Sequence, residues 1–226
     1  MKEKWLPYLI LMMGIIYIFV VPAQPQGVKI LFKLIPMLLI IFYAYLIKPK
    51  DKQKLSAILL LGLFFCMLGD GLLIWFVVGL TAFLIGHIFY TVGFFTQWKF
   101  SWPRALTIIP IAIYGFVMGS QLVEALQTNQ QTALMIPVIV YIIAISLMFW
   151  SAVMSGNVAA MIGSGLFVIS DSILAWNKFV EQIIYSGELI MITYYSAQFL
   201  IAYSLKNFFI SEPYNMGLIE EKASIK

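Results

Sequence analysis

The sequence contains few charged residues. Only 11% of its 226 residues are Asp, Glu, Lys or Arg, and 62% are hydrophobic, whereas about a quarter of the residues of a soluble domain are charged. This composition excludes a water-soluble globular domain. The charges are clustered and separate long apolar runs, each close to the roughly 20 residues that cross a hydrocarbon core about 30 Å thick. The runs lack the alternation of barrel strands, so we expect helices, whose backbone hydrogen bonds are satisfied within the segment.

Cysteine and histidine are also scarce, with one residue of each, Cys66 and His87. A single cysteine excludes an intrachain disulfide. The two residues cannot supply the usual ligands of a zinc hydrolase, so we expect no metal and no other cofactor. The sequence has no glycine-rich phosphate loop and no G-x-S-x-G nucleophile motif. A net charge of +4 is too small and too scattered for a nucleic-acid surface, so no nucleic-acid partner is expected.

The apolar runs predict an all-α polytopic membrane protein, a bundle of about eight transmembrane helices. We expect one domain, residues 1–210, followed by a short polar tail, residues 211–226. Prolines and tryptophans near the ends of the runs support this division. The predicted helices are 5–21, 28–47, 55–74, 76–97, 103–124, 132–151, 157–176 and 187–206.

The distribution of cations predicts the orientation of the chain. An even number of helices places both termini on one side, which then carries eleven of the fourteen Lys and Arg residues; Lys29, Lys33 and Lys178 lie on the other side. The positive-inside rule therefore predicts cytoplasmic termini. We expect the membrane to be the plasma membrane of a bacterium. The eleven are Lys2, Lys4, Lys48, Lys50, Lys52, Lys54, Lys99, Arg104, Lys206, Lys222 and Lys226.

A shift of 101 residues suggests an internal repeat. It aligns Gly14 with Gly115, Pro36 with Pro137, Gly62 with Gly163, Asp70 with Asp171, and Trp75 with Trp176. Two parallel four-helix units, 1–100 and 101–210, would be related by an axis along the membrane normal. Identity over the rest of the shift barely exceeds what this composition produces by chance, so duplication and coincidence both stay open.

Four ionisable groups lie inside apolar runs: Lys33, Asp70, His87 and Asp171. Such groups cost roughly 2.5–3.5 kcal/mol each on insertion scales, which makes them functional candidates. Asp70 and Asp171 each lie about 15 residues into helices of the same direction. At 1.5 Å per residue both carboxyl groups reach about the same depth, in the outer third of the bilayer.

Polar residues of the antiparallel helices fall in the same layer and are candidates for supporting or substrate-binding roles. His87 and Tyr90 are three residues apart, and Tyr194 and Gln198 are four apart, so each pair shares a helix face. These faces can line one cavity. Ser170 and Tyr195 complete the candidate set.

Each candidate also has a structural interpretation. The aspartates could join helices by hydrogen bonds without any chemistry. Lys33 could extend to the membrane surface instead of binding a phosphate. His87 and the tyrosines could be packed side chains.

Two aspartates in one poorly hydrated pocket favour acid catalysis, because burial and like charge oppose the ionisation of both. One can then donate a proton while the other stays anionic, as acid-catalysed cleavage of a glycosidic or enol ether bond requires. A proton-coupled transporter is the main alternative, since membrane carboxylates and parallel repeats also suit transport. Helices broken at Pro36 and Pro137 would favour it. A non-catalytic lipid-binding or scaffolding protein is the third interpretation.

Several motifs follow one another along the chain: KLIP at 33–36, LGD at 68–70, GLTAF at 79–83, GHIFY at 86–90, SDSILA at 170–175 and YYSAQ at 194–198. In this order they resemble the YhhN-like family, which includes the lysoplasmalogenases. The resemblance spans nearly the whole chain.

The resemblance implies hydrolysis of the vinyl ether bond of a lysoplasmalogen, which releases a fatty aldehyde and a glycerophosphoethanolamine or glycerophosphocholine. A lysophospholipid and water would be the reaction partners. It also implies that Asp70 and Asp171 are the essential pair. We expect Lys33, His87, Tyr194 and Gln198 to orient the headgroup or water. Another enol ether, an ether lipid or an epoxide-like substrate stays open.

Overall fold

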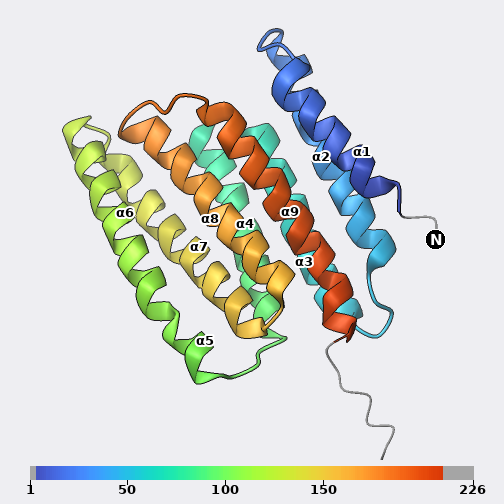
Figure 1. The fold of residues 1–226 in the computed structure, drawn as a ribbon. Helices are drawn as coiled ribbons and strands as arrows, with labels where there is room; N and C mark the ends of the chain where they lie inside the picture. The colour runs from blue at the N-terminus through green and yellow to red at the C-terminus, as the bar shows by residue number, and fades with distance from the viewer. Residues whose placement is uncertain (1–3, 211–226) are drawn as a thin grey trace, which may run out of the picture.

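A computed structural model describes residues 4–210 of the chain, which form a helical bundle (Figure 1). Helix α1 continues into a single π-helical turn, Ile16–Val20, and a 3₁₀ turn, Thr132–Leu134, precedes α7. The helices are α1 Leu6–Ile15, α2 Gln26–Ile47, α3 Gln53–Leu72, α4 Phe76–Phe95, α5 Trp102–Leu106, α6 Ile108–Thr128, α7 Met135–Ser155, α8 Val158–Phe179 and α9 Ser186–Ile210.

The all-helical membrane architecture that the sequence predicts is confirmed. All eight predicted helices have a counterpart in residues 4–210, and six helical segments between Gln26 and Phe179 are long and apolar enough to cross a membrane. The fifth predicted helix differs most, because Thr107 separates α5 from α6 and the helix continues to Thr128. The predicted polar tail, 211–226, lies outside the described residues.

The two prolines at matching positions do not break their helices. Pro36 lies inside α2, which is continuous from Gln26 to Ile47. Pro137 lies in the first turn of α7, where a missing N–H group removes no helical hydrogen bond. The broken helices that would favour a transporter are therefore absent at these two positions.

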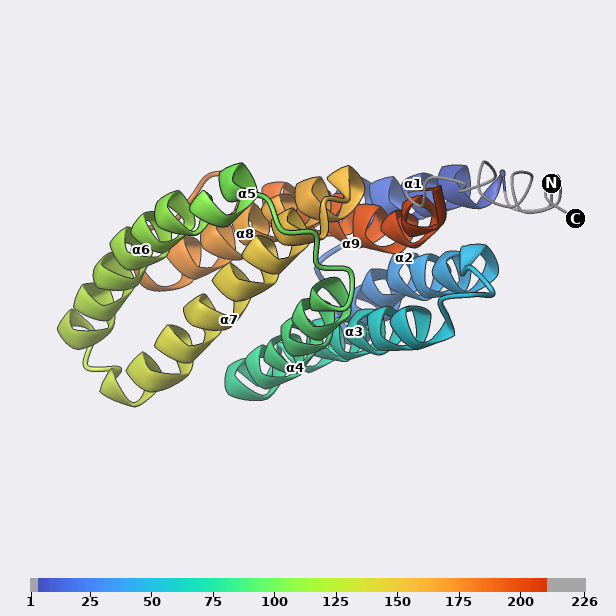
Figure 2. The same ribbon diagram turned by 90° about the horizontal axis from the view of Figure 1, so that it is seen from below.

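Six helices form a closed ring. Helices α2, α3, α4, α7, α8 and α9 contact one another in this order, and α9 contacts α2 again. Helix α1 packs outside the ring on α2 and α9, and α6 packs outside it on α7 and α8 (Figure 2). The order of contacts is the same in both halves of the chain. This arrangement supports two related four-helix units about the bundle axis, and duplication stays a prediction.

Close contacts of small residues hold the tightest helix pairs in register. A Cβ atom at Gly62 of α3 would lie 2.4 Å from the ring of Tyr90 on α4, and one at Gly163 of α8 would lie 2.9 Å from the carbonyl oxygen of Ala197 on α9. In lipid, small residues at helix interfaces permit such close approach. These contacts fix the rotation of α4 and α9, which carry five of the candidate site residues.

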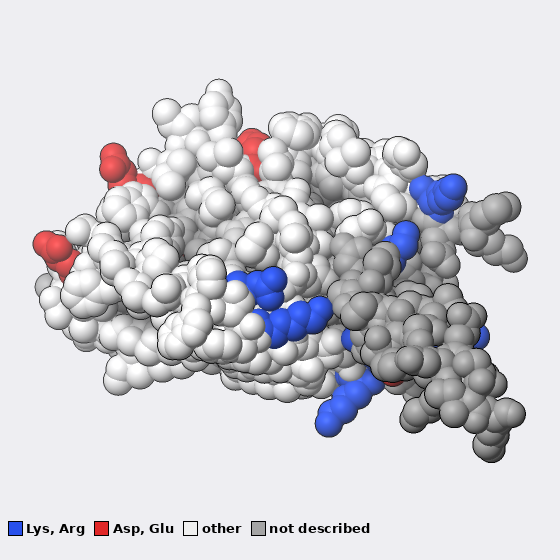
Figure 3. Space-filling model, turned by 60° about the horizontal axis from the view of Figure 1, so that its bottom comes forward, with Lys and Arg blue, Asp and Glu red and all other residues white. Residues whose placement is uncertain are grey.

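Cations gather at one end of the bundle. The α2–α3 connection carries Lys48, Lys50 and Lys52, and the chain around α5 carries Lys99 and Arg104. Figure 3 looks toward this end, and most of the visible Lys and Arg side chains lie there. The asymmetry agrees with the predicted charge distribution. That this end faces the cytoplasm stays a prediction.

Candidate functional site

Asp70 lies near the C-terminal end of α3, with only 2% of its side chain exposed. The Lys33 Nζ atom, from α2, is 3.0 Å from its Oδ1 atom. The Tyr194 hydroxyl, from α9, donates a hydrogen bond to Oδ2 at 2.7 Å. Burial of an ionised carboxylate requires a charge partner and hydrogen bonds, and Asp70 has both. The alternative in which Lys33 extends to the membrane surface is wrong, because its ammonium group pairs with Asp70.

Asp171 lies in the second half of α8, with 14% of its side chain exposed. The Tyr141 hydroxyl, from α7, donates a hydrogen bond to its Oδ2 atom. The His87 Nε2 atom, from α4, lies 2.9 Å from the Tyr141 hydroxyl and 3.6 Å from the same carboxylate oxygen. A continuous polar chain therefore runs from His87 through Tyr141 to Asp171.

His87 is completely buried, and its ring packs edge-to-face on Phe167 with the ring centroids 4.6 Å apart. Its Nδ1 atom has no hydrogen-bond partner among the described residues. Because the Tyr141 hydroxyl gives its one proton to Asp171, it can only accept a hydrogen bond from the Nε2–H group of His87.

The two aspartates are held in the same manner. Asp70 on α3 takes one partner from the preceding helix, α2, and one from α9, the last helix of the other half. Asp171 on α8 takes one from its preceding helix, α7, and one from α4, the last helix of the first half. Each carboxyl group is therefore positioned by both halves of the chain.

Asp70 and Asp171 line one cavity of about 260 Å³, which we call the polar cavity. It reaches the end of the bundle where α8 connects to α9, and Glu188 there adds a negative group. Lys29 and Lys33 line it from α2. The polar cavity therefore holds groups of both charges and has room for water beside the two carboxyl groups.

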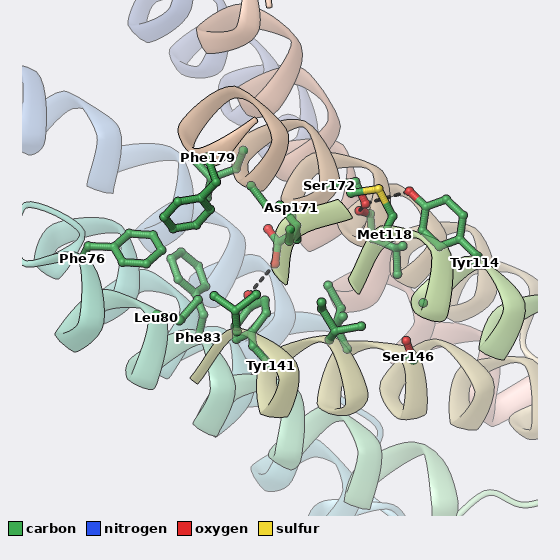
Figure 4. A pocket seen from close by; sticks show the side chains of 18 of the residues that line it. Phe76, Leu80, Phe83, Tyr114, Met118, Tyr141, Ser146, Asp171, Ser172 and Phe179 are labelled. Atoms are coloured by element: carbon green, nitrogen blue, oxygen red, sulfur yellow. Dashed lines mark hydrogen bonds between the residues drawn. The ribbon is translucent and has the colours of Figure 1, made fainter. Parts of the chain in front are cut away.

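A second hollow of about 70 Å³, which we call the apolar chamber, lies beside the polar cavity, between α6, α7, α8 and the start of α4. Asp171 lines both spaces, as do Leu73, Phe83 and Leu174. Figure 4 shows the hydrogen-bonded pair of Asp171 and Tyr141 among the aromatic and aliphatic side chains of this chamber. Asp171 therefore stands at the boundary between a polar and an apolar space.

Tyr90 and Gln198 pair with each other and not with the aspartates. The Tyr90 hydroxyl donates a hydrogen bond to Gln198 Oε1 at 2.6 Å, and both side chains are completely buried. Gln198 Nε2 has no partner among the described residues. The pair joins α4 to α9 about one helical turn from Tyr194. We therefore expect Tyr90 and Gln198 to support the site and not to contact a headgroup.

Ser170 and Tyr195 have positioning contacts. The Ser170 hydroxyl lines the polar cavity and donates to the carbonyl oxygen of Ile190 at 3.0 Å, which links α8 to α9. The Tyr195 hydroxyl donates to the carbonyl oxygen of Lys33 at 2.8 Å. Tyr195 therefore fixes the backbone at the lysine that pairs with Asp70.

The chain matches the model of a known protein family over most of its length. The model of the YhhN family matches residues 28–205, which include both aspartates and the partners of each. This chain belongs to the YhhN family. The resemblance predicted from the motifs is confirmed.

Named relatives of this YhhN-family chain are lysoplasmalogenases. Lysoplasmalogenase TMEM86B of Mus musculus is 29% identical over 208 residues, which cover 89% of this chain and 86% of the relative. The Homo sapiens protein of the same name is 30% identical over 210 residues, with the same two coverages. Lysoplasmalogenase TMEM86A of Homo sapiens is 37% identical over 161 residues, 63% of this chain and 62% of the relative. No solved structure matches the chain.

The site of this YhhN-family chain includes residues that the sequence analysis missed. Tyr141 bonds to Asp171, and Tyr17, Lys29 and Glu188 line the polar cavity. Tyr141 could have been noticed as a hydroxyl group in the middle of an otherwise aliphatic run. Among residues 4–210, no three His, Cys, Asp or Glu side chains come together in a group that could hold a metal ion.

Proposed function

We propose that this protein is a membrane hydrolase that cleaves the vinyl ether bond of a lysoplasmalogen, releasing a fatty aldehyde and glycerophosphoethanolamine or glycerophosphocholine. The observation that carries the proposal is the pair of carboxyl groups, Asp70 and Asp171, lining one cavity that adjoins an apolar chamber. The names of the relatives support the same reaction.

The reaction needs one proton donor and one water molecule. In the proposal Asp171 gives its proton to the β-carbon of the vinyl ether, which leaves an oxocarbenium cation at the carbon bonded to oxygen. Water adds to this carbon and loses a proton, which forms a hemiacetal. The hemiacetal then collapses to the aldehyde and the glycerol hydroxyl group. One water is consumed, and the catalytic proton is returned.

The contacts of the two aspartates favour this division of roles. The ammonium group of Lys33 next to Asp70 favours a carboxylate there, whose negative charge stabilises the cation and orients the attacking water. Asp171 bonds to Tyr141, and Tyr141 lies within hydrogen-bond distance of His87. The proton that the attacking water loses can pass to the Asp171 carboxylate, which restores the acid without a further proton source.

The first test compares two lipids. Protein purified into lipid nanodiscs is incubated with a lysoplasmalogen and with its saturated alkyl-ether analogue, and aldehyde is measured. Aldehyde from the vinyl ether alone is the expected result, because only an enol ether can accept a proton at carbon. Asp70→Asn and Asp171→Asn should each lower kcat by about 10²–10⁴-fold.

The matched control is Asp51→Asn, an exposed aspartate in the α2–α3 connection, which should keep normal activity. Wild-type activity in either the Asp70 or the Asp171 variant would refute the assigned pair. Failure of the wild-type protein to release aldehyde from any vinyl ether would refute the function itself.

The second test follows the oxygen atoms. In ¹⁸O-labelled water the hemiacetal route leaves the glycerol oxygen in place, so the glycerophosphodiester product should carry no label. Label in the glycerol hydroxyl group would mean that the other carbon–oxygen bond breaks, which would contradict protonation at carbon followed by addition of water.

A further inference from the structure

The apolar chamber continues toward the other end of the bundle. A further hollow of about 360 Å³, which we call the inner chamber, shares Tyr114, Ser146 and Val168 with it. The inner chamber reaches Met161, ten residues before Asp171 on α8. Ten helical residues span about 15 Å. This is half of a hydrocarbon core about 30 Å thick, the depth that one lipid chain occupies.

The lining of the two chambers suits a hydrocarbon chain. It is almost entirely aliphatic and aromatic, and its polar exceptions include Tyr114, whose hydroxyl group donates to Ser172 at 2.8 Å. On the other side of Asp171, the polar cavity offers Lys29 and Glu188, groups of opposite charge. A zwitterionic phospholipid headgroup carries one charge of each sign to match them.

We propose that one lysophospholipid binds across Asp171, with its headgroup in the polar cavity and its single hydrocarbon chain in the apolar and inner chambers. The phosphate faces Lys29, because Lys33 is engaged by Asp70, and the headgroup amine faces Glu188. The bond between chain and glycerol oxygen then lies beside Asp171. The identity of this bond as the one cleaved rests on the proposed function.

If the proposal is correct, the size of the two chambers determines which hydrocarbon chain lengths bind well. Each buried methylene raises the binding constant about fourfold. A bulky side chain that fills the chambers should therefore weaken the binding of long-chain lipids more than that of short-chain lipids. Val168 lines both chambers, whereas the next residue, Ile169, is 48% exposed on the lipid-facing side of α8. Val168→Trp and Ile169→Trp are therefore a matched pair.

The experiment measures kcat/KM for a long-chain and a short-chain lysoplasmalogen. Val168→Trp should lower the long-chain value about 10- to 100-fold relative to the short-chain value, and Ile169→Trp should leave the ratio of the two unchanged. Equal loss for both chain lengths, or no loss for either, would overturn the chain site.

A second matched pair keeps the test informative if Val168→Trp does not fold. Met118 of α6 lines the apolar chamber, and its neighbour Val117 is 53% exposed. Met118→Trp should reproduce the selective loss of long-chain turnover, and Val117→Trp should not. If Met118→Trp and Val117→Trp had the same ratio of long-chain to short-chain kcat/KM, the chambers would not be the site of the hydrocarbon chain.

The headgroup end is tested separately. Lys29→Gln should raise KM for a lysoplasmalogen about tenfold, the loss of one charge-assisted contact, and leave KM for a phosphate-free alkenyl glycerol unchanged. A similar rise for both substrates would show that Lys29 does not recognise the phosphate.

Binding measurements separate this inference from the proposed function. If the wild-type protein cleaves no vinyl ether, the proposed function fails, and saturated alkyl-ether lysophospholipids of two chain lengths still probe the chambers. Native mass spectrometry should then show tighter binding of the longer lipid, and Val168→Trp should abolish the difference. Chain-independent binding to the wild-type protein would overturn the inference on its own.

Discussion

Replacement of Lys33 by methionine should damage both the stability and the activity of this protein. Methionine is close in length to the four-carbon stem of lysine, is also unbranched and apolar, and lacks the ammonium group. That group lies 3.0 Å from Asp70, whose side chain is 2% exposed. The substitution therefore leaves a buried carboxyl group without its charge partner.

The size of the effect follows from these contacts. Removal of one member of a buried ion pair costs about 3–5 kcal/mol when the other charge stays uncompensated. The Tyr194 hydrogen bond to Asp70 remains, and the carboxyl group borders the polar cavity, so we expect the lower end, about 3 kcal/mol. Asp70 can also escape the penalty by binding a proton, which removes the anion that the proposed mechanism uses. A fall in kcat of about 100-fold is then expected.

The assay is a double-mutant cycle on protein in detergent micelles. Unfolding free energies and kcat are measured for Lys33→Met, Asp70→Asn and the double variant, with Lys54→Met, an exposed lysine at the start of α3, as control. The summed stability losses of Lys33→Met and Asp70→Asn should exceed the stability loss of the double variant by about 1–3 kcal/mol. Lys54→Met should change stability by less than about 0.5 kcal/mol. Additive losses, or a Lys33→Met variant as stable and active as wild type, would refute a working ion pair.

Three other substitutions test the remaining contacts. Tyr141→Phe removes the hydroxyl group between His87 and Asp171 and should lower kcat by about 10- to 100-fold, measured as aldehyde release, and stability by about 1–3 kcal/mol, because the buried His87 loses its hydrogen-bond partner; unchanged kcat would contradict a role for Tyr141 in the reaction. Combined with Tyr194→Phe on the Asp70 side, it should cost less than the product of the two single losses, because groups acting in one transition state are not additive; losses that multiply would mean independent contributions. Gly163→Val should destabilise the bundle by about 1–3 kcal/mol in denaturant unfolding, since its Cβ would meet the Ala197 carbonyl oxygen at 2.9 Å; a variant of wild-type stability would mean that α8 and α9 can separate at little cost.

The sequence predicted the helices and the two acidic centres because each leaves a strong signal. Apolar runs of membrane length have few other structures open to them. An aspartate or lysine within such a run is costly enough to indicate a role. Asp70, Asp171 and Lys33 were found in this way, and the structure brings Asp70 and Asp171 to one cavity.

The partners of each aspartate could not be predicted, because the rotation of these helices is weakly encoded. A helix that is apolar on all sides has no polar face to tell which side points inward. Tyr90 and Tyr194 lie in similar surroundings in the sequence, yet one pairs with Gln198 and the other with Asp70. Tyr141 was missed for a related reason, since tyrosine is common in packed interiors and carries no charge to distinguish it.

The ring of helices explains why the site lies where it does. Neither half of the chain holds its own aspartate alone, because Asp70 depends on α9 and Asp171 depends on α4. The contact between the two halves therefore creates the polar cavity at the same time as it closes the ring. Helix α6 stands outside this ring and forms one wall of the apolar chamber. Among residues 4–210, the ring helices that α6 contacts are α7 and α8, whereas the partners of the two carboxyl groups come from α2, α4, α7 and α9, so the acid pair is positioned without any residue of α6.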